Sequence, residues 1–215
     1  MTYLQLVNKV LVKLREGEVT SVSEKAYSKL IGSFVNEAME EIEDSHNWSM
    51  LRQEFDVTTV ASTNQYTITG LGDRYSVLFA LNITEDGKMF KVAYDWIKRN
   101  LDLGTQSEGS PHYYAFSGQD SAGDPNINVS PVPNGVETLR FYVVKRSPEL
   151  SLDTDTLSIP SRAVILGAYY RAIEERGEDL GDPALTAQRK YNRAWADAVA
   201  YDKDLLGEEE TWQVD

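Results

Sequence analysis

Hydrophobic residues recur at spacings of three and four along the first part of the chain. Over residues 3–15 this spacing predicts an amphipathic helix, which the pair Glu16-Gly17 should end. A second hydrophobic stripe runs from Ala26 to Ile42 and predicts a longer helix that reaches His46 or Trp48. The linker between the two helices is short, so they should form an αα-hairpin.

The spacing changes to alternation in the middle of the chain, which is typical of β-strands. Residues 75–84 and 89–94 flank the sequence Glu85-Asp86-Gly87-Lys88. Because Asp-Gly tolerates positive φ, this stretch predicts a β-hairpin. Asp95 is a suitable cap for a short helix over residues 96–101.

The segment INVSPVPNGVETLRFYVVKR, residues 127–146, predicts two strands joined by a turn that contains Pro131 and Pro133. We interpret it as a second β-hairpin. Neither proline can donate a backbone hydrogen bond, so both suit an edge or a corner of a sheet. Such a hairpin is either a rigid, outward-facing docking platform or simply an exposed hairpin of a β-sandwich.

Two more stripes at helical spacing follow towards the end of the chain. The first begins after Ser161 and contains Gly167, which should let another helix approach closely. The second begins at Asp182-Pro183, with proline in the first turn, and fades near Leu206.

This order of elements, with helices at both ends and strands between them, predicts an α+β fold. We expect the N- and C-terminal helices, residues 1–50 and 161–206, to form one four-helix bundle. Residues 51–160 should form an inserted antiparallel β-sandwich or barrel module. Residues 207–215 should be a C-terminal extended tail.

The chain carries a net charge of −13. Tight nucleic-acid binding is therefore not expected, because Lys and Arg contacts to phosphate supply most of that affinity. The acidity either serves solubility alone or provides a surface past which DNA slides without sticking. Residues 1–15 are an exception, with three basic residues and no acidic one.

The composition also restricts the location of the protein. No hydrophobic run approaches the length needed to span a membrane, and the N-terminal residues do not have the pattern of a signal peptide. The chain has no cysteine, which excludes disulfides and fits synthesis in a cytoplasm.

No motif in the sequence points to catalysis, to a metal or to a cofactor. His46 and His112 lack a second ligand at metal-binding spacing. Asp153-Thr154-Asp155 resembles the start of a calcium loop, but the later glycine and glutamate are missing. We therefore expect a protein that is not an enzyme and that needs no cofactor.

Aromatic residues are the more informative feature, with 12 tyrosines and four tryptophans in the chain. Core packing accounts for most of them, and an interface or a sugar-binding face for the rest. A group of them falls within or near the strands: Tyr94, Trp96, Tyr113, Tyr114 and Phe116. Trp212 stands alone in the acidic tail, and we expect it to dock on another subunit.

Three features together resemble the head-to-tail adaptor proteins of short-tailed bacteriophages, a family also described as connector or tail tubular protein A-like. The first is the order of helix pair, strand insertion, helix pair and acidic tail. The second is a succession of short blocks: Pro111-His112-Tyr113-Tyr114-Ala115, Pro131-x-Pro133-Asn134-Gly135 and Leu139-Arg140-Phe141-Tyr142. The third is DTDTLSIP, residues 153–160, before a tyrosine-rich helix. The resemblance covers most of the chain.

The resemblance implies a structural virion protein, a ring that is usually of twelve subunits. The ring would join the portal protein to the tail nozzle or tail fibres and line the channel through which genomic DNA passes without tight binding. The protein would be made in the cytoplasm of the bacterial host, would not enter a membrane, and would end in the tail or neck of the virion.

Two sets of interface residues follow from this reading. The end of the chain should contact the portal or a neighbouring subunit through Leu205, Leu206, Trp212 and Val214. The strand module should face the tail or fibres through Tyr113, Tyr114, Pro131, Pro133 and Asn134.

Two other classes stay open. The chain could be the partner- or carbohydrate-binding β-module of a phage tail or fibre attachment protein, with its affinity in Tyr113, Tyr114 and Trp96. It could also be an enzyme with an unrecognised site, which would require a deep pocket with clustered titratable groups. The size of the protein in solution, with and without portal protein, would separate these classes.

Overall fold

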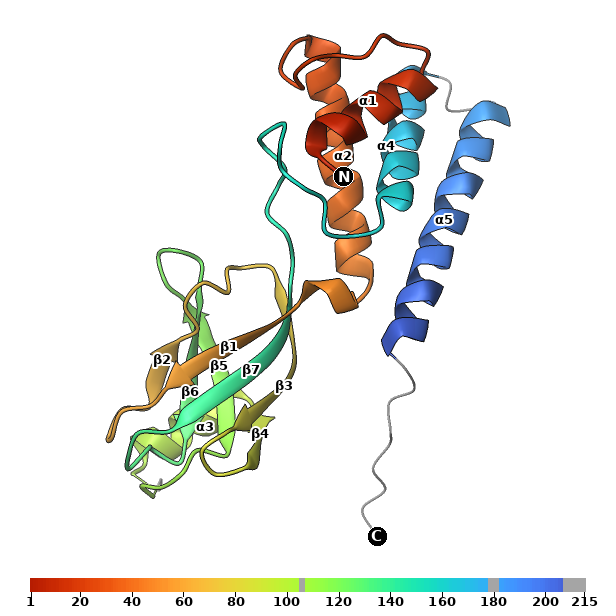
Figure 1. The fold of residues 1–215 in the computed structure, drawn as a ribbon. Helices are drawn as coiled ribbons and strands as arrows, with labels where there is room; N and C mark the ends of the chain where they lie inside the picture. Colours follow the sequence, from red (N-terminus) through yellow and green to blue (C-terminus); the bar gives the residue numbers. More distant parts are fainter. Residues whose placement is uncertain (105–106, 178–181, 207–215) are drawn as a thin grey trace. The chain divides into compact units, whose positions relative to one another are not determined.

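The structure, a computed structural model, describes residues 1–104, 107–177 and 182–206. The chain divides into two compact units (Figure 1). The helical unit consists of Met1–Leu51 and Ser147–Asp215, and the strand-rich unit consists of Arg52–Arg146. The fold is α+β, as the order of the sequence patterns predicted.

The helical unit is built around one central helix. Its described elements are α1 (Tyr3–Lys13), α2 (Ala26–Ser45), the short 3-10 helix η1 (Ser49–Leu51), α4 (Ser161–Glu175) and α5 (Asp182–Leu206). α4 packs against α1, α2 and α5, while α5 packs against α4 and η1. Helices from both ends of the chain therefore share one core.

Gly167 lies where α4 meets two other helices. A Cβ atom added there would lie 3.0 Å from Ala38 Cβ on α2 and 3.0 Å from Tyr191 Cε2 on α5. These distances are tighter than ordinary packing, so the glycine permits both close approaches. The sequence-based expectation for this residue is confirmed.

The side of α5 that packs on α4 carries three alanines and one tyrosine. Ala184, Ala187, Tyr191 and Ala194 are buried, whereas Leu185 is 49% exposed. The hydrophobic stripe predicted from the sequence for this helix included Leu185, Tyr191 and Ala194, and it was correct for Tyr191 and Ala194 and wrong for Leu185. Alanine allows the two helix backbones to come close, which a stripe of large side chains would prevent.

The loop between the strands and α4 also belongs to the helical unit. The Tyr3 N–H donates to the Asp155 carbonyl at 2.8 Å, at the start of α1. The Leu150 N–H donates to Asn36 Oδ1 on α2 at 3.1 Å. The boundary that the sequence suggested at residue 160 therefore falls at residue 147 in the structure, because this loop is hydrogen-bonded to the helices.

The strand-rich unit holds seven strands and one helix among its described residues. They are β1 (Arg52–Thr58), β2 (Gln65–Thr67), β3 (Tyr75–Asn82), β4 (Gly87–Lys91), α3 (Tyr94–Asp102), β5 (Tyr113–Gln119), β6 (Pro125–Ser130) and β7 (Thr138–Lys145). The strands form one curled sheet in the order β1-β7-β3-β4-β5-β6-β2. Each strand contributes side chains to one buried cluster inside the curl or packed against it, for example Val57, Ala80, Met89, Tyr114, Ile127 and Phe141.

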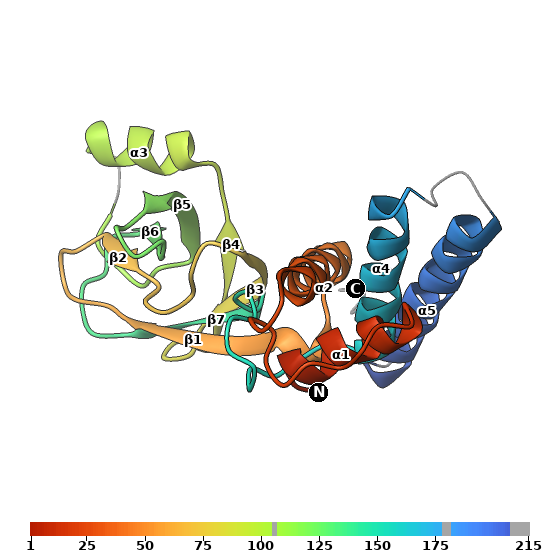
Figure 2. The ribbon, with the colours of Figure 1, turned by 90° about the horizontal axis from the view of Figure 1, so that it is seen from above.

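One strand pair departs from the antiparallel module that the sequence predicted. β4 and β5 run parallel, with Phe90 opposite Tyr113, and α3 makes the crossover between them. A parallel pair needs such a connection, because a tight turn can only join antiparallel strands. α3 lies against β5 and β6 on the outside of the curl (Figure 2).

The two predicted hairpins have different outcomes. β3 and β4 pair across Asp86, which has a φ of 49°, so the Asp-Gly hairpin is confirmed. β6 and β7 do not pair with each other, since β6 lies between β5 and β2 and β7 lies between β1 and β3. The strands of residues 127–146 were predicted correctly, and their pairing was wrong.

The proline segment between β6 and β7 is a crossing rather than a hairpin turn. Its carbonyl groups accept hydrogen bonds from other loops: Ser62 N–H to Pro133 at 2.8 Å, Gly109 N–H to Val132 at 2.9 Å and the Thr59 hydroxyl to Gly135 at 2.9 Å. Pro131 and Pro133 lack the N–H groups that a tight hairpin ladder would use. The segment therefore carries the chain from one part of the curled sheet to another.

A cross-strand ion pair fixes the register of β1 and β7. Asp56 and Arg140 are direct partners, and Arg140 Nε and Nη2 donate to the two Asp56 carboxylate oxygens at 2.7 and 2.8 Å. These hydrogen bonds hold the pKa of Asp56 below its ordinary value. A one-residue slip would break the pair and turn the buried side chains outward.

Candidate interaction surfaces

Four exposed aromatic side chains lie on neighbouring elements of the strand-rich unit: Phe90, Tyr94, Trp96 and Tyr113. We call them the aromatic surface. Phe90 is on β4, Tyr94 and Trp96 are on α3, and Tyr113 is on β5. The exposed fractions are 53% for Phe90 and 45% for Trp96, so two large rings face solvent. A contiguous group of exposed aromatic side chains often marks an interaction site, whereas single exposed hydrophobic residues are common on any protein surface.

Three of the four rings of the aromatic surface contact one another at an angle, with Tyr113 between the other two. The Trp96 and Tyr113 ring centroids are 5.3 Å apart with ring planes at 60°, and those of Phe90 and Tyr113 are 6.3 Å apart with planes at 41°. Lys88 and Lys98 lie near the Phe90 and Tyr94 rings, each with its Nζ within 6 Å of the ring centroid. The surface is therefore faceted and carries positive charge at its edge.

The scaffold beneath the aromatic surface is fixed. Ile97 of α3 is fully buried against the sheet. Parallel pairing holds Phe90 and Tyr113 opposite each other. A partner would thus meet rings that are already positioned, which lowers the entropic cost of binding.

The strand-module residues proposed from the sequence have different surroundings. Tyr113 and Asn134 are exposed, Pro131 is partly exposed, and Pro133 is buried. Tyr114 is 3% exposed and packs edge-on against Phe141, with the ring centroids 5.2 Å apart. Neighbouring residues of a strand point to opposite faces, so only one of the two tyrosines can reach the surface.

Burial also changes the chemistry of Tyr114. Desolvation raises the pKa of its hydroxyl above the ordinary value. Its role in this unit is packing inside the curled sheet. Phe90, which the sequence reading did not include, takes the outward position next to Tyr113. The alternation of β4, in which Met89 is buried and Phe90 is exposed, was the signal for it.

Of the residues proposed at the end of the chain, two lie within the described part. Leu205 is 58% exposed and Leu206 is 36% exposed, at the last turn of α5. Trp212 and Val214 lie outside the described residues. Two exposed leucines next to each other at a helix end provide apolar contact area for a partner.

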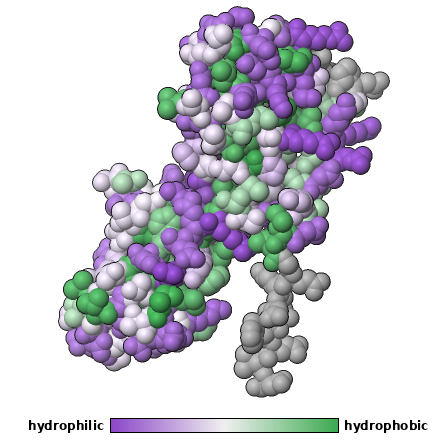
Figure 3. Space-filling view, viewed as in Figure 1, coloured by the Kyte–Doolittle hydropathy of each residue, from purple (hydrophilic) through white to green (hydrophobic). Residues whose placement is uncertain are grey.

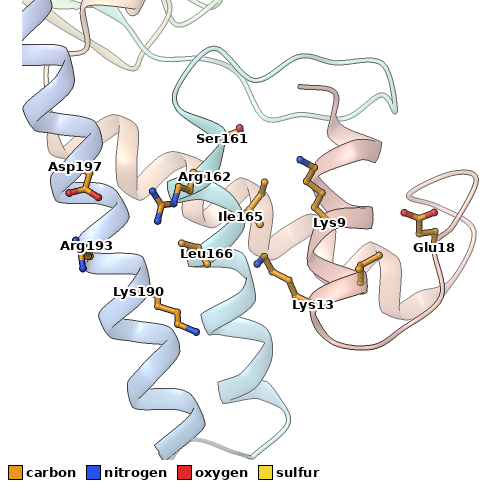
Figure 4. A pocket seen from close by; sticks show the side chains of 11 residues that line it. Lys9, Lys13, Glu18, Ser161, Arg162, Ile165, Leu166, Lys190, Arg193 and Asp197 are labelled. Atoms are coloured by element: carbon orange, nitrogen blue, oxygen red, sulfur yellow. The ribbon is translucent and has the colours of Figure 1, made fainter.

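A groove on the helical unit was not anticipated from the sequence. It has a volume of about 880 Å³ and lies over α4, between α1 and α5 (Figure 4). Its lining residues are Lys9, Val12, Lys13, Glu18, Ser161, Arg162, Ile165, Leu166, Lys190, Arg193 and Asp197. Five of these residues are basic and two are acidic, so we call it the basic groove.

Side chains from three helices line the basic groove. Residues 9, 12 and 13 come from α1, residues 162, 165 and 166 from α4, and residues 190, 193 and 197 from α5. Positions three or four apart lie on one side of a helix. In the space-filling view, the visible face of the helical unit is largely hydrophilic (Figure 3).

The buried carboxylates of the described residues serve as hydrogen-bond acceptors within the fold. Glu137 accepts from the Ser110 hydroxyl at 2.6 Å and also from the Asn82 side chain. Asp124 accepts from the N–H groups of Gly70 and Gly72, both at 2.7 Å. No cluster of three or more His, Asp or Glu side chains that could hold a metal ion occurs in the part of the chain that the structure describes.

The acidic residues of α2 are partly used inside the helical unit. Arg171 of α4 pairs with Glu41 and Glu37. Glu43 is fully buried, and its carboxylate accepts from the Ser147 N–H at 2.9 Å. These acidic side chains therefore help to hold the helical unit together. No helix among the described residues is long and hydrophobic enough to cross a membrane.

The comparisons with known proteins agree with the resemblance seen in the sequence. The family model described as SU10 adaptor protein matches residues 1–212, which is almost the whole chain. A comparison with curated proteins returns no match.

Proposed function

Because this chain belongs to the SU10 adaptor protein family, we propose that it is the head-to-tail adaptor of a tailed phage. In this proposal it is a structural protein of the virion neck that joins the portal protein to the tail nozzle or tail fibres. Its subunits form a ring, of twelve copies by the resemblance to short-tailed phage adaptors, around the channel for genomic DNA. It acts by binding and needs no catalysis or cofactor.

The observation that carries this proposal is the division of the chain into two units, each with its own exposed binding surface. The helical unit has its own core and offers the basic groove and the exposed end of α5. The strand-rich unit has a separate core and offers the aromatic surface. An adaptor has to hold two different partners, and two independently folded units provide two such sites.

We assign the aromatic surface to the tail side. Aromatic rings that are exposed, clustered and rigidly held are the usual anchors of protein interfaces. Lys88 and Lys98 at its edge suit a partner with acidic groups around an apolar centre. The end of the chain, including Leu205 and Leu206, is assigned to the portal or to the neighbouring subunit.

The charge of the chain fits the passage of DNA. A subunit with a net charge of −13 repels phosphate and offers few sites where the DNA backbone can be neutralised. The same charge keeps free subunits apart. Once portal rings hold several subunits side by side, the effective concentration of lateral contacts rises and the ring can close.

The test is assembly on the portal of the same phage. The purified chain alone should be monomeric by light scattering. After mixing with purified portal rings, negative-stain electron microscopy should show an added ring around a central hole. A chain that stays unbound at concentrations well above those in the infected cell would contradict the proposal.

One alternative has some support from the aromatic surface, namely a carbohydrate-binding module of a tail or fibre attachment protein. Sugar rings stack on flat aromatic faces, whereas Trp96 and Tyr113 meet at 60° and offer no common plane. The geometry therefore favours a protein partner. Binding of the isolated chain to host surface polysaccharide, lost on Trp96→Ala, would favour the alternative instead.

A further inference from the structure

The basic groove stands out against the charge of the whole chain. Lys9, Lys13, Arg162, Lys190 and Arg193 line it in a protein with 34 acidic and 21 basic residues. Among the residues that the structure describes, no carboxylate forms an ion pair with Lys9, Arg162, Lys190 or Arg193, whereas Arg140, Arg171 and Arg176 are all paired. The groove therefore concentrates cations that the described fold does not neutralise.

The walls and floor of the groove differ in character. Lys9 and Lys13 on α1 and Lys190 and Arg193 on α5 flank the α4 residues Ile165 and Leu166 (Figure 4). Val12 adds a side chain that is 54% exposed. A floor of apolar groups between cationic walls suits a peptide with acidic residues and one large apolar side chain.

We propose that the basic groove receives the acidic C-terminal segment, residues 207–215, of a second copy of this chain. The sequence of this segment is GEEETWQVD, with Glu208, Glu209, Glu210 and Asp215 as acidic residues and Trp212 as the large apolar one. The carboxylates pair with the cations of the walls, and Trp212 lies over the apolar floor. This proposal extends the proposed function, because a ring places copies side by side.

The length of the chain favours a second copy over the same one. Lys190 lies 16 residues before the end of α5 at Leu206, which corresponds to about 24 Å along a helix. Glu210 lies four residues after Leu206, or at most about 14 Å of extended chain. Measured between Cα atoms, Glu210 of the same chain therefore stops about 10 Å short of Lys190 even if the fully extended chain turns straight back, so the three glutamates reach the α5 wall of their own groove only with backbone and side chains stretched. The acidic segment of a neighbouring subunit starts from a different place, so this limit on its reach does not apply to it.

Nucleic acid is a weaker match for the groove. The acidic surface of the rest of the chain repels a duplex, and the groove volume of about 880 Å³ is that of a peptide or small-molecule site. The apolar floor would contribute nothing to contacts with phosphate. Acidic peptide therefore fits both the charge and the hydrophobic part of the site.

The first test is binding of a fluorescent peptide of residues 207–215 to the full-length chain, measured by anisotropy at a dilution at which the chain is monomeric. The double variant Lys190→Glu/Arg193→Glu should weaken binding about tenfold or more. The matched control Arg189→Glu/Lys203→Glu makes the same charge change on the same helix outside the groove and should change affinity less than about twofold.

Two further results decide the outcome of this test. A peptide with Glu208→Lys, Glu209→Lys and Glu210→Lys should bind the Lys190→Glu/Arg193→Glu chain better than it binds the unchanged chain. Equal weakening by both double variants would overturn the proposal, as would binding of duplex DNA, but not of the peptide, that depends on Lys190 and Arg193.

The second test uses the absence of cysteine from the chain. One preparation carries Val12→Cys in the groove and another, with a different tag, carries Val214→Cys in the acidic segment. Mild oxidation of the mixture should give a disulfide-linked heterodimer, and Lys190→Glu/Arg193→Glu in the first chain should suppress it. Leu152→Cys, at an exposed site outside the groove, is the control partner and should give little product.

Neither test contains portal protein, so the two proposals can fail separately. A chain that assembles on portals but shows no groove-dependent peptide binding or crosslinking overturns only the assignment of the groove. A chain that passes both tests and ignores portals overturns only the proposed adaptor function.

Discussion

Asp202 in the last turns of α5 is hydrogen-bonded to His46, which follows α2, with 3.0 Å between Asp202 Oδ2 and His46 Nε2. The Asp202 side chain is almost completely buried. It also accepts from the Ser49 hydroxyl at 2.5 Å and from the Ser49 N–H at 3.0 Å. One carboxylate thus fastens the end of α5 to the turn after α2, and so fixes the place from which the acidic segment leaves.

Asp202→Ala should destabilise the helical unit. The substitution leaves the partly buried donors of Ser49 without their acceptor, at an expected loss of about 1–3 kcal/mol. Urea denaturation followed by far-ultraviolet circular dichroism measures this loss. Asp204→Ala, two residues away and exposed, should change the free energy of unfolding by less than about 0.5 kcal/mol. Equal effects of the two variants would mean that Asp202 does not hold the helix end.

Gly32→Ala should weaken the contact between α2 and α1. The new Cβ atom would lie 2.3 Å from the Tyr3 hydroxyl oxygen, which is far inside contact distance. We expect a loss of about 1–3 kcal/mol by overpacking, although alanine is the better helix former. Tyr3→Phe removes the clashing oxygen, so the double variant should recover part of the loss. Additive losses in this double-mutant cycle would contradict the clash.

Asp124 should make the strand-rich unit sensitive to acid. The N–H groups of Gly70 and Gly72 donate to its carboxylate and hold its pKa below the ordinary value. A lowered folded-state pKa gives stability that is complete above the unfolded pKa of about 3.9 and is lost as the pH falls towards the folded value.

The measurement for Asp124 is chemical denaturation between about pH 6 and pH 2.5, a range that spans the ordinary carboxyl pKa. The unchanged chain should lose more stability below about pH 4 than Asp124→Asn does. The variant should be the less stable of the two at neutral pH, because it has lost a charged acceptor. Parallel stability curves for the two proteins would show that Asp124 has no part in the acid sensitivity.

Phe90→Ala/Trp96→Ala should reduce binding of the adaptor to its tail component without unfolding the strand-rich unit. Removal of two anchor rings is expected to weaken the interaction by more than about tenfold. Tyr201→Ala is a suitable control, since Tyr201 is also an exposed aromatic residue but lies on α5 in the helical unit. Binding of purified tail protein by interferometry compares the three chains. A stronger effect of Tyr201→Ala would place the interface elsewhere.

Deletion of residues 206–215 should abolish ring formation on portals and leave the fold intact. Leu206 is exposed at the end of α5, so its loss removes little packing. Electron microscopy of portal mixtures measures assembly, and circular dichroism with thermal denaturation checks the fold. Normal rings from the shortened chain would contradict a role for this end in assembly.

Local signals made parts of this fold predictable from the sequence. The Asp86-Gly87 turn identified the β3–β4 hairpin, because the residues that determine it are adjacent. The pairing of β7 with β1 and β3 depends on contacts between distant parts of the chain, and no short pattern encodes those. The sequence therefore predicted the positions of the strands more reliably than it predicted which strands pair in the sheet.

The interaction surfaces show the same difference between features that adjacent residues encode and features that only the fold brings together. Tyr113 could be proposed from its sequence context, and strand alternation explains why Tyr114 next to it is buried. The basic groove could not be proposed, because Lys9, Arg162 and Arg193 come from three helices that only the fold brings together. The one hint was the excess of basic residues in positions 1–15, which lies within an otherwise acidic chain.

The discontinuous helical unit has a consequence for biosynthesis. α1 and α2 leave the ribosome first, but the loop and α4 that cover them come more than 100 residues later. The strand-rich unit is contiguous in sequence and can fold during translation. Over the same period the hydrophobic sides of the first two helices remain exposed to solvent. A ribosome that stalls once residue 146 has left its exit tunnel would thus carry a complete strand-rich unit and a helix pair whose hydrophobic side is still exposed to chaperones, until the remaining helices are made.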